Sequence, residues 1–192
     1  MSTQTVLNKQ ELTKLLKKDV KYFNKYREEQ GHIDLRGVVL SGFDLKGVNF
    51  KCVDLRMADL VKADMKWADL SHAILSMANL EGSSLYESNL SSAVLYKANL
   101  RKVNLCKADL RMAYLVKSDL SGSKIGGAVF TEAFLDNVNF TEADLRMAEL
   151  NGAKIEGTCF SKADLRMAYF HENQAVSILK AMDINVVGEN NE

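Results

Sequence analysis

The sequence predicts an all-β solenoid, and three features of one stretch support that prediction. From Leu35 to Phe170 every fifth residue is large and apolar: twenty Leu, five Phe, two Ile and one Met. The residue two places before each of these is Ala, Ser or Thr in twenty-one of the twenty-eight repeats, and the residue between them is Asp or Asn in sixteen. The chain contains no proline, whose missing N–H would interrupt a main-chain ladder.

A period of five excludes the two common regular structures as the source of this pattern. An α-helix turns about 100° per residue, so residues five apart spread around its surface, and a strand alternates its side chains with a period of two. A three-residue extended piece followed by a two-residue corner does fit. In Ala58-Asp59-Leu60 the first and third side chains then share one face, the middle one points away, and residues 61 and 62 form the bend.

The second corner position indicates a turn with an unusual backbone conformation. Glycine adopts positive φ without steric penalty, and it occupies this position in eight repeats: Gly37, Gly42, Gly47, Gly82, Gly122, Gly127, Gly152 and Gly157. Lys or Met occupies many of the others. We therefore expect glycine to be favourable at this corner but not required.

A chain that bends the same way after each short side closes into a coil, and successive coils pair through main-chain hydrogen bonds. Large and small side chains then alternate inside a narrow tube and fill it. The repeats resemble the A-(D/N)-L-x-x consensus of the pentapeptide-repeat family, which occurs unchanged at Ala68-Asp69-Leu70, Ala78-Asn79-Leu80, Ala98-Asn99-Leu100, Ala108-Asp109-Leu110 and Ala163-Asp164-Leu165. The resemblance implies a right-handed quadrilateral β-helix with four repeats per coil and about seven coils, roughly 34 Å long at about 4.8 Å per coil.

One domain with three segments is expected: an amphipathic N-terminal capping helix over 1–30, the repeats over 31–172, and a short C-terminal helix and tail over 173–192. Asn8 and Glu11 have the spacing of a capping box. Apolar residues follow at three- and four-residue intervals: Leu12, Leu15, Leu16, Val20, Phe23 and Tyr26. We expect this helix to cover the open coil end, whose unpaired main-chain groups favour association between edges.

Both ends of the repeat region show further signs of closure. In the first coil bulky residues replace the small ones and are expected to plug the tube: Ile33, Val38, Phe43 and Val48. After Phe170 a second helix is expected, capped by Asn173, with Val176, Leu179 and Met182 on its apolar face. In some members of the family that the repeats resemble, a C-terminal element forms a homodimer, so the resemblance implies a homodimer as an alternative role for this helix.

Composition excludes several classes of function. The formal net charge of the chain is zero, and no segment is strongly charged, so neither direct nucleic-acid binding nor a membrane-surface role is expected. The three cysteines, at 52, 106 and 159, lie at unrelated positions, which indicates reduced thiols and a cytoplasmic protein. No signal peptide or apolar run of membrane-spanning length is recognisable.

The sequence contains no recognisable catalytic constellation. His32, His72 and His171 are dispersed, and none has the spacing to cysteines or carboxylates that metal ligands need. Phosphate-binding loops and nucleophile elbows are absent from the sequence. Asp and Asn at the middle of the repeats are better explained by hydrogen bonds to the turn main chain. We therefore expect no enzyme activity, no catalytic residue, no cofactor and no metal.

One surface column differs from the others. If a coil holds four repeats, residues twenty apart stack on one face. One such column has four apolar residues in succession, and two more flank it at the following corner: Ile74, Val94, Tyr114, Phe134, Tyr96 and Val116. Two interpretations compete, because exposed apolar patches usually indicate contact. Either a terminal helix of the same chain lies over the column, or another molecule binds there.

The phrase Asp-Leu-Arg-Met-Ala occurs four times and places an arginine at a corner each time: Arg56, Arg111, Arg146 and Arg166. Trp67 lies on the same corner column as Met147 and Met167, with Tyr86 on a neighbouring column, and an exposed aromatic of this kind can anchor a partner. The simpler expectation is that each guanidinium pairs with the aspartate two residues before it.

These features favour a non-enzymatic interaction scaffold, a rigid rod that binds a protein partner, itself or both through the apolar column. The alternative is a DNA mimic that regulates a DNA-binding enzyme such as DNA gyrase, as the family resemblance implies. The chain departs from that pattern because its repeats are nearly neutral, Leu-centred and uninterrupted by a loop, although a local acidic face remains at Asp44, Asp64, Asp144 and Asp164. A structural role in a larger assembly is a third class.

Overall fold

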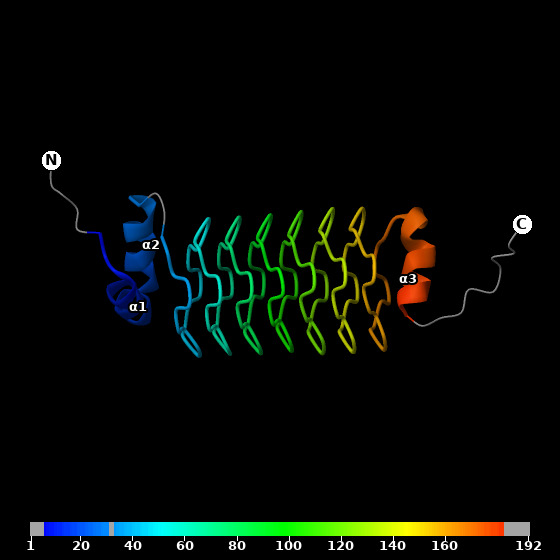
Figure 1. The fold of residues 1–192 in the computed structure, drawn as a ribbon, viewed down its shortest axis with the longest axis horizontal. Coiled ribbons are helices and arrows are strands. Elements are labelled where there is room, and N and C mark those ends of the chain that lie inside the picture. Colours follow the sequence, from blue (N-terminus) through cyan, green and yellow to red (C-terminus); the bar gives the residue numbers. More distant parts are fainter. Residues whose placement is uncertain (1–5, 31–32, 183–192) are drawn as a thin grey trace, which may run out of the picture.

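The computed structural model describes residues 6–30 and 33–182. An elongated stack of coils lies between two groups of helices (Figure 1). Helices α1 (Lys9–Lys18) and α2 (Val20–Glu28) lie at one end, and the 3-10 turn η1 (Glu172–Gln174) and helix α3 (Ala175–Ala181) lie at the other. The sides of the stack carry none of these helices.

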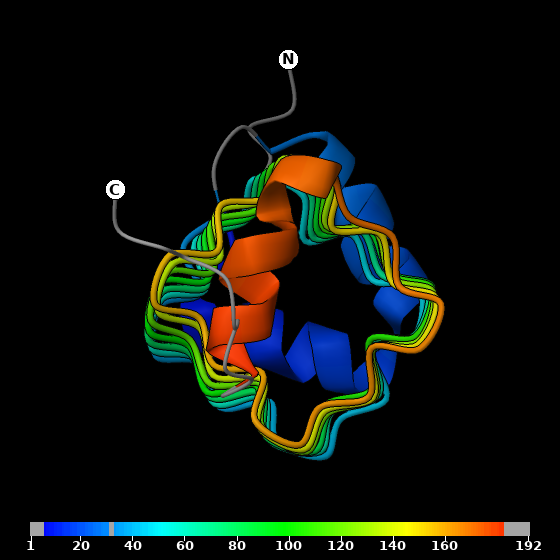
Figure 2. The same ribbon diagram turned by 90° about the vertical axis from the view of Figure 1, so that its right-hand side faces the viewer.

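Parallel β-bridges join the middle residue of each repeat to the middle residue twenty places on, as in Asp34 with Asp54 and Asp54 with Ile74. Four repeats of five residues separate the bridged positions, so each coil has four sides, and the view along the stack shows a four-sided tube (Figure 2). The bridges are isolated and involve one residue in each repeat. Longer strands do not form between these positions, because a corner follows every three-residue side.

Main-chain hydrogen bonding explains why the middle residue of a repeat is so often Asp or Asn. The N–H groups of one repeat donate as follows: Asp54 to Ile33 O at 3.2 Å, Leu55 to Ile74 O at 2.8 Å, Arg56 to Asp54 Oδ1 at 3.1 Å, Met57 to Ser76 O at 3.1 Å, and Ala58 to Leu55 O at 3.0 Å. Three of these bonds connect neighbouring coils and one closes the turn. The remaining donor, at the first corner position, needs the side-chain oxygen of the middle residue.

The second corner position has a left-handed backbone throughout the repeats. The glycines predicted there have φ between 62° and 70°, and nineteen other residues share the region with φ between 54° and 62°. None of those nineteen is Val, Ile or Thr, whereas Val61, Val116, Thr131 and Thr141 occupy first corner positions. This distribution confirms that glycine is not required, and it agrees with the high cost of positive φ for a β-branched residue.

Lys102→Val is expected to lower the free energy of unfolding by about 1–2 kcal/mol, because Lys102 is exposed and has a φ of 54° that a β-branched side chain opposes. Ser121→Val is the matched control. Ser121 lies at a first corner position of the next coil, and Val61 already occupies the equivalent site. Urea denaturation compares the two variants, and equal losses would contradict a conformational cause.

The interior of the tube is continuous and mostly apolar, and its buried small positions also include Ser83, Ser88, Ser118, Ser123 and Thr158. The large residue of every repeat from Leu35 to Phe160 is buried, and most of the small residues two places before them are also buried. The bulky residues predicted to plug the first coil are buried as well, except Phe43, which is partly exposed. Burial decreases in the last coil, where Phe170 is 37% exposed.

The N-terminal segment forms two helices, so the helix expected over 1–30 is broken in two. Asn8 and Glu11 form the predicted capping box, but α1 ends at Lys18 and the extended backbone of Asp19, with φ of −160°, begins a second helix. The Asp19 carboxylate accepts a hydrogen bond from the N–H of Tyr22. An unbroken helix of twenty residues would be about 30 Å long, and the break lets both pieces lie against the coil end.

Side chains of these helices satisfy main-chain groups of the first coil. Asn24 donates to Gly47 O at 2.9 Å and accepts from the N–H of Asn49 at 2.8 Å. The Lys9 ammonium donates to Arg36 O, and the Arg27 guanidinium donates to Lys51 O. Below these contacts the ring of Phe23 meets that of Phe50 edge to face, with centroids 5.7 Å apart.

The C-terminal helix begins later than predicted. Helix α3 follows Gln174, and Asn173 does not cap it. The buried amide of Gln174 instead donates to Leu150 O at 3.1 Å and Ala153 O at 2.8 Å, which ties the end of the stack to η1. Among the helix side chains that the structure describes, Ile178 is buried and Leu179 is exposed, while the side chain of Val176 and residues 183–192 lie outside the described residues.

Candidate interaction surface

Four apolar residues of the predicted column stack on one face of the tube. Parallel bridges join Ile74 to Val94, Val94 to Tyr114 and Tyr114 to Phe134. The rings of Tyr114 and Phe134 have centroids 5.7 Å apart, and the ring of Tyr96 lies 6.4 Å from that of Tyr114. We use the name apolar column for the six residues on this face: Ile74, Val94, Tyr96, Tyr114, Val116 and Phe134.

The apolar column remains accessible. Tyr114 is 39% exposed and the other five residues are partly exposed. Helices α1, α2 and α3 lie at the two ends of the stack (Figure 1), so the interpretation in which a terminal helix lies over the column is wrong for these three helices. The physical reason is the break at Asp19, which lets the N-terminal segment fold across the coil end instead of along the side.

The apolar column lacks the side-chain hydrogen-bond acceptors that Asp and Asn provide at the equivalent positions of other repeats. Where the middle residue is Asp or Asn, its side chain accepts the N–H of the first corner residue, as Asp109 does for Arg111 at 3.0 Å. An apolar middle residue has no such acceptor. Among the described residues, nothing accepts a hydrogen bond from the N–H of Ser76, Tyr96, Val116 or Asp136. Single apolar residues occur at other middle positions, but only this face has four in succession within the described chain.

Ion pairs border the N-terminal end of the column. Arg36 donates to Asp34 and Arg56 to Asp54, each at 2.6 Å, and Arg36 lies 3.8 Å from Asp54. Asp54 is only 4% exposed. The hydrogen bonds from the Arg56 guanidinium hold the pKa of the Asp54 carboxyl below its usual range. This end of the face therefore carries four charged side chains, and their two positive and two negative charges cancel.

Asp54→Asn is expected to lower the free energy of unfolding by about 1–3 kcal/mol at pH 7, because it removes a nearly buried charge-assisted pair and keeps the turn acceptor. A lowered folded pKa contributes stability above the unfolded pKa of about 3.9. That contribution is lost as the pH falls through the folded pKa, so the difference between the variant and the natural chain should begin to narrow near pH 4 and continue to narrow at lower pH.

Chemical denaturation at pH 7, 4 and 3 measures this difference. Asp44→Asn is the matched control, since the Asp44 side chain is 69% exposed and pairs with Lys46 at 2.9 Å. Exposed pairs of this kind contribute roughly 0–1 kcal/mol. A difference for Asp54→Asn that stays constant with pH would contradict the assigned role of the carboxylate charge.

Cations border the aromatic part of the column. The Lys154 ammonium lies 4.6 Å from the centroid of Phe134, and the Lys97 ammonium lies 5.2 Å from that of Tyr96. These lysines are not among the predicted residues, although Lys154 holds the next position of the same column. The signal that identifies it is the spacing of twenty residues from Phe134.

The arginine corners have the predicted partners. Arg56, Arg111, Arg146 and Arg166 each donate to the aspartate two residues before them, at 2.6 to 2.8 Å. The same pairing neutralises the candidate acidic face. Lys46 contacts both Asp44 and Asp64, and Arg146 contacts both Asp144 and Asp164.

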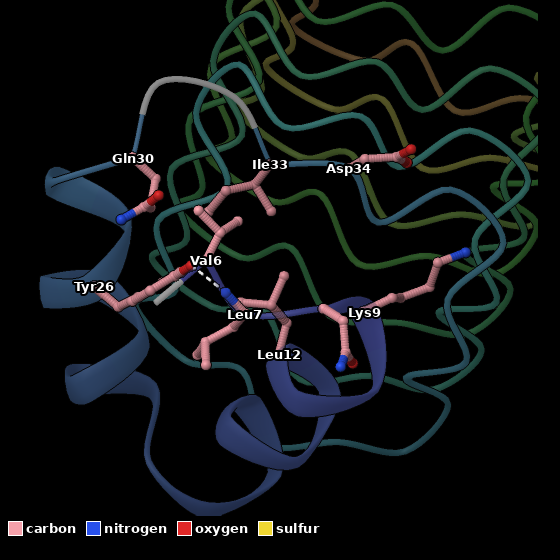
Figure 3. Close-up of a pocket in the computed structure, with 9 residues that line it drawn as sticks. Val6, Leu7, Lys9, Leu12, Tyr26, Gln30, Ile33 and Asp34 are labelled. Carbon is pink, nitrogen blue, oxygen red and sulfur yellow. Dashed lines mark hydrogen bonds between the residues drawn. The ribbon is translucent and has the colours of Figure 1, made fainter. Parts of the chain in front are cut away.

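The N-terminal junction contains a pocket of about 340 Å³ between α1, α2 and the first coil (Figure 3). The Tyr26 hydroxyl accepts the N–H of Leu7 there at 2.9 Å. The two charged side chains that line the pocket already have hydrogen-bond partners, since Lys9 donates to Arg36 O and Asp34 accepts from Arg36. Residues 6–30 and 33–182 contain no group of three His, Cys, Asp or Glu arranged to hold a metal ion. No helix within these ranges is long and apolar enough to cross a membrane.

Comparisons with known proteins agree with this geometry. The family described as "Pentapeptide repeats" matches with eight copies over residues 32–66, 63–101, 83–122 and 123–161. No curated protein matches.

Solved structures of repeat proteins also match. HetL, a pentapeptide repeat protein involved in heterocyst differentiation regulation from the cyanobacterium Nostoc sp. strain PCC 7120, is 21% identical over 85% of this chain and 93% of its own, with a TM-score of 0.37. Full-length QnrB1, a plasmid-mediated fluoroquinolone resistance protein, is 19% identical over 80% and 88%, with a TM-score of 0.35. Rfr23 from the cyanobacterium Cyanothece 51142 is 24% identical over 80% and 97%, with a TM-score of 0.30.

The family match covers more than half of the chain, and its residues are those that form the bridged coils. The structure explains the match, because the repeats have buried apolar centres every five residues and pair with residues twenty places away. The chain therefore belongs to the pentapeptide-repeat family.

Proposed function

We propose that this protein is a non-enzymatic cytoplasmic scaffold, a rod of about seven right-handed coils with helical caps, that binds a protein partner through the apolar column. One observation carries the proposal. On a single face, four successive middle positions hold partly exposed apolar side chains where the fold otherwise favours Asp or Asn. Free thiols at all three cysteines support a reducing compartment.

The local energetics support a role in contact. An unpaired main-chain N–H is unfavourable, and a net hydrogen bond contributes about 0.5–1.5 kcal/mol to stability. Asp or Asn at these positions would restore the bond to Tyr96 N or Val116 N without any change inside the tube. The apolar side chains forgo this hydrogen bond, and they give a partner aromatic and aliphatic surface on a rigid support.

The alternative, a DNA mimic acting on an enzyme such as DNA gyrase, receives less support from the charges. A phosphate mimic needs carboxylates that present negative potential to a partner. Asp44, Asp64, Asp144 and Asp164 all lie within 4 Å of a lysine or arginine nitrogen. Such pairing reduces the field of the face, so we favour the apolar column as the contact surface.

The double substitution Tyr114→Asp with Phe134→Asp tests the proposal. We expect it to abolish partner retention while the free energy of unfolding changes by no more than about 1 kcal/mol, because each aspartate adds a turn acceptor and removes a surface ring contact. Tagged protein is used to capture partners from an extract of the source cell, and mass spectrometry compares what the natural and variant chains retain.

The control variant is Met147→Asp with Met167→Asp, which adds the same charge at exposed sites away from the column: Met147 is 53% and Met167 is 70% exposed. Partners kept by this control and lost by the column variant would support the proposal. Identical retention by all three proteins would overturn it, and so would a large loss of stability that is confined to the column variant.

A further inference from the structure

The face that holds the apolar column has an ordered sequence of charges along its length. Asp54, which is 4% exposed and paired with Arg56, precedes the four apolar middle residues, and Lys154 follows them, so an acid lies at one end of the column and a base at the other. At the adjoining corner the order is reversed, with Arg56 at one end and Glu156 at the other. An apolar centre with opposite charges at its two ends has the pattern of a self-complementary surface.

We propose that the apolar column binds a second copy of this chain, with the two rods antiparallel and face to face; this inference rests on the proposed function and names the partner. The two-fold axis lies between the coil sides of Val94 and Tyr114. It sets Val94 opposite Tyr114 of the second copy and Ile74 opposite Phe134. Apolar residues then meet apolar residues across the whole centre of the face.

The same axis pairs the charges. It places Asp54 opposite Lys154, Arg56 opposite Glu156 and, at the other corner of the face, His72 opposite Glu132. Every one of these pairs occurs twice, because a two-fold interface repeats each contact. Lys97 and Lys117 form the one like-charged pair, and the Lys97 ammonium already lies over the Tyr96 ring.

Other arrangements of two copies are less complementary. In a parallel two-fold arrangement each middle residue of this face lies opposite the same residue of the second copy, which sets Asp54 against Asp54 and Lys154 against Lys154. A shift of the antiparallel rods by one coil in either direction sets Ile74 against Lys154 or Phe134 against Asp54. Apolar residues opposite charges and like charges opposite each other both oppose association, so the surface specifies one orientation and one register.

Disulfide cross-linking tests the orientation and register. In a background with Cys52, Cys106 and Cys159 replaced by Ser, we introduce Ser76→Cys and Asp136→Cys. These positions face each other across the proposed axis. Within one chain they are three coils, or roughly 14 Å, apart, which is too far for an internal disulfide. We expect covalent dimer to form at least tenfold faster in the double variant, and in an equimolar mixture of the two single variants, than in either single variant alone.

Ser84→Cys with Asp144→Cys is the matched control. It has the same residue types and the same separation of three coils on the opposite face, and we expect no faster cross-linking than in its single variants. Addition of Tyr114→Asp and Phe134→Asp to the Ser76→Cys, Asp136→Cys protein is expected to remove the tenfold gain. Analytical ultracentrifugation of the natural chain is expected to show a monomer–dimer equilibrium that these aspartates shift to the monomer.

Three results would overturn the inference. They are a natural chain that stays monomeric at every concentration tested, single variants that cross-link as fast as the double variant, and a dimer that persists with aspartates at 114 and 134. None of these results depends on the capture experiment. If the column variant still loses captured proteins, the proposed function stands with a different partner; if it loses neither a copy nor a captured protein, both proposals fail.

Discussion

Phe130→Ala is expected to lower the free energy of unfolding by about 3–5 kcal/mol, which is the largest effect that a single side-chain truncation should have in the middle of this rod. Phe130 is fully buried in the tube. Its ring meets that of Phe140 edge to face, with centroids 6.1 Å apart, and Phe140 stacks on Phe160 at 5.2 Å. Truncation therefore leaves a cavity beside the Phe140 ring, which its stacking on Phe160 holds in place.

Phe134→Ala is the matched control, because it removes the same side chain four residues later in the same coil. Phe134 points outward, where it contacts Tyr114 and the Lys154 ammonium. Surface contacts of this kind contribute about 0.5–1.5 kcal/mol. Guanidinium denaturation of both variants measures the difference, and equal losses would contradict the division of the coil into an interior and an outward face.

The sequence was sufficient to predict the stack because its information is local and periodic. Two residues in five face the interior, and the Asp or Asn between them satisfies a donor two residues away, so each repeat specifies its own shape. The position of the apolar column follows from the same period. A difference of twenty residues identifies neighbours along the stack without any knowledge of the coordinates.

The ends of the stack were harder to predict because their contacts are not periodic. Asp19 fits a helical pattern in the sequence as well as it fits the start of a new helix, and the limited size of the coil end decides between them. Gln174 gives no signal in the sequence, because its acceptors at Leu150 and Ala153 are 24 and 21 residues away. Sequence periodicity also cannot show whether a segment lies over the column, since that depends on how the end segments turn.

The apolar column illustrates how stability and contact compete for the same positions. At Asp109 the middle residue completes a turn and pairs with a corner arginine, so it contributes to the fold alone. At Tyr114 the equivalent position offers a ring to the surroundings and leaves the N–H of Val116 without an acceptor in the described chain. A rod built from independent repeats can accept such exchanges on one face, because neighbouring coils keep their own hydrogen bonds.

Phe23→Ala is expected to have the second large effect, and its effect should be confined to one end. Phe23 is fully buried and holds α2 against Phe50 of the first coil. The substitution, with a loss of about 3–5 kcal/mol, removes the largest fully buried side chain that holds the short helices α1 and α2 to the first coil. We expect the two helices to detach while the central coils stay folded, since each coil in a stacked repeat depends mainly on its neighbours.

Hydrogen exchange measured by mass spectrometry tests this expectation. Peptides that cover Lys9–Glu28 should lose protection in the variant, and so should the N–H of Asn49, which donates to Asn24. The exposed coil edge should then promote end-to-end association that light scattering detects as the concentration rises. Tyr22→Ala, one residue away in the same helix but 61% exposed, should leave both properties unchanged. Uniform loss of protection along the whole rod would contradict a local effect and would mean that the helices and coils unfold as one unit.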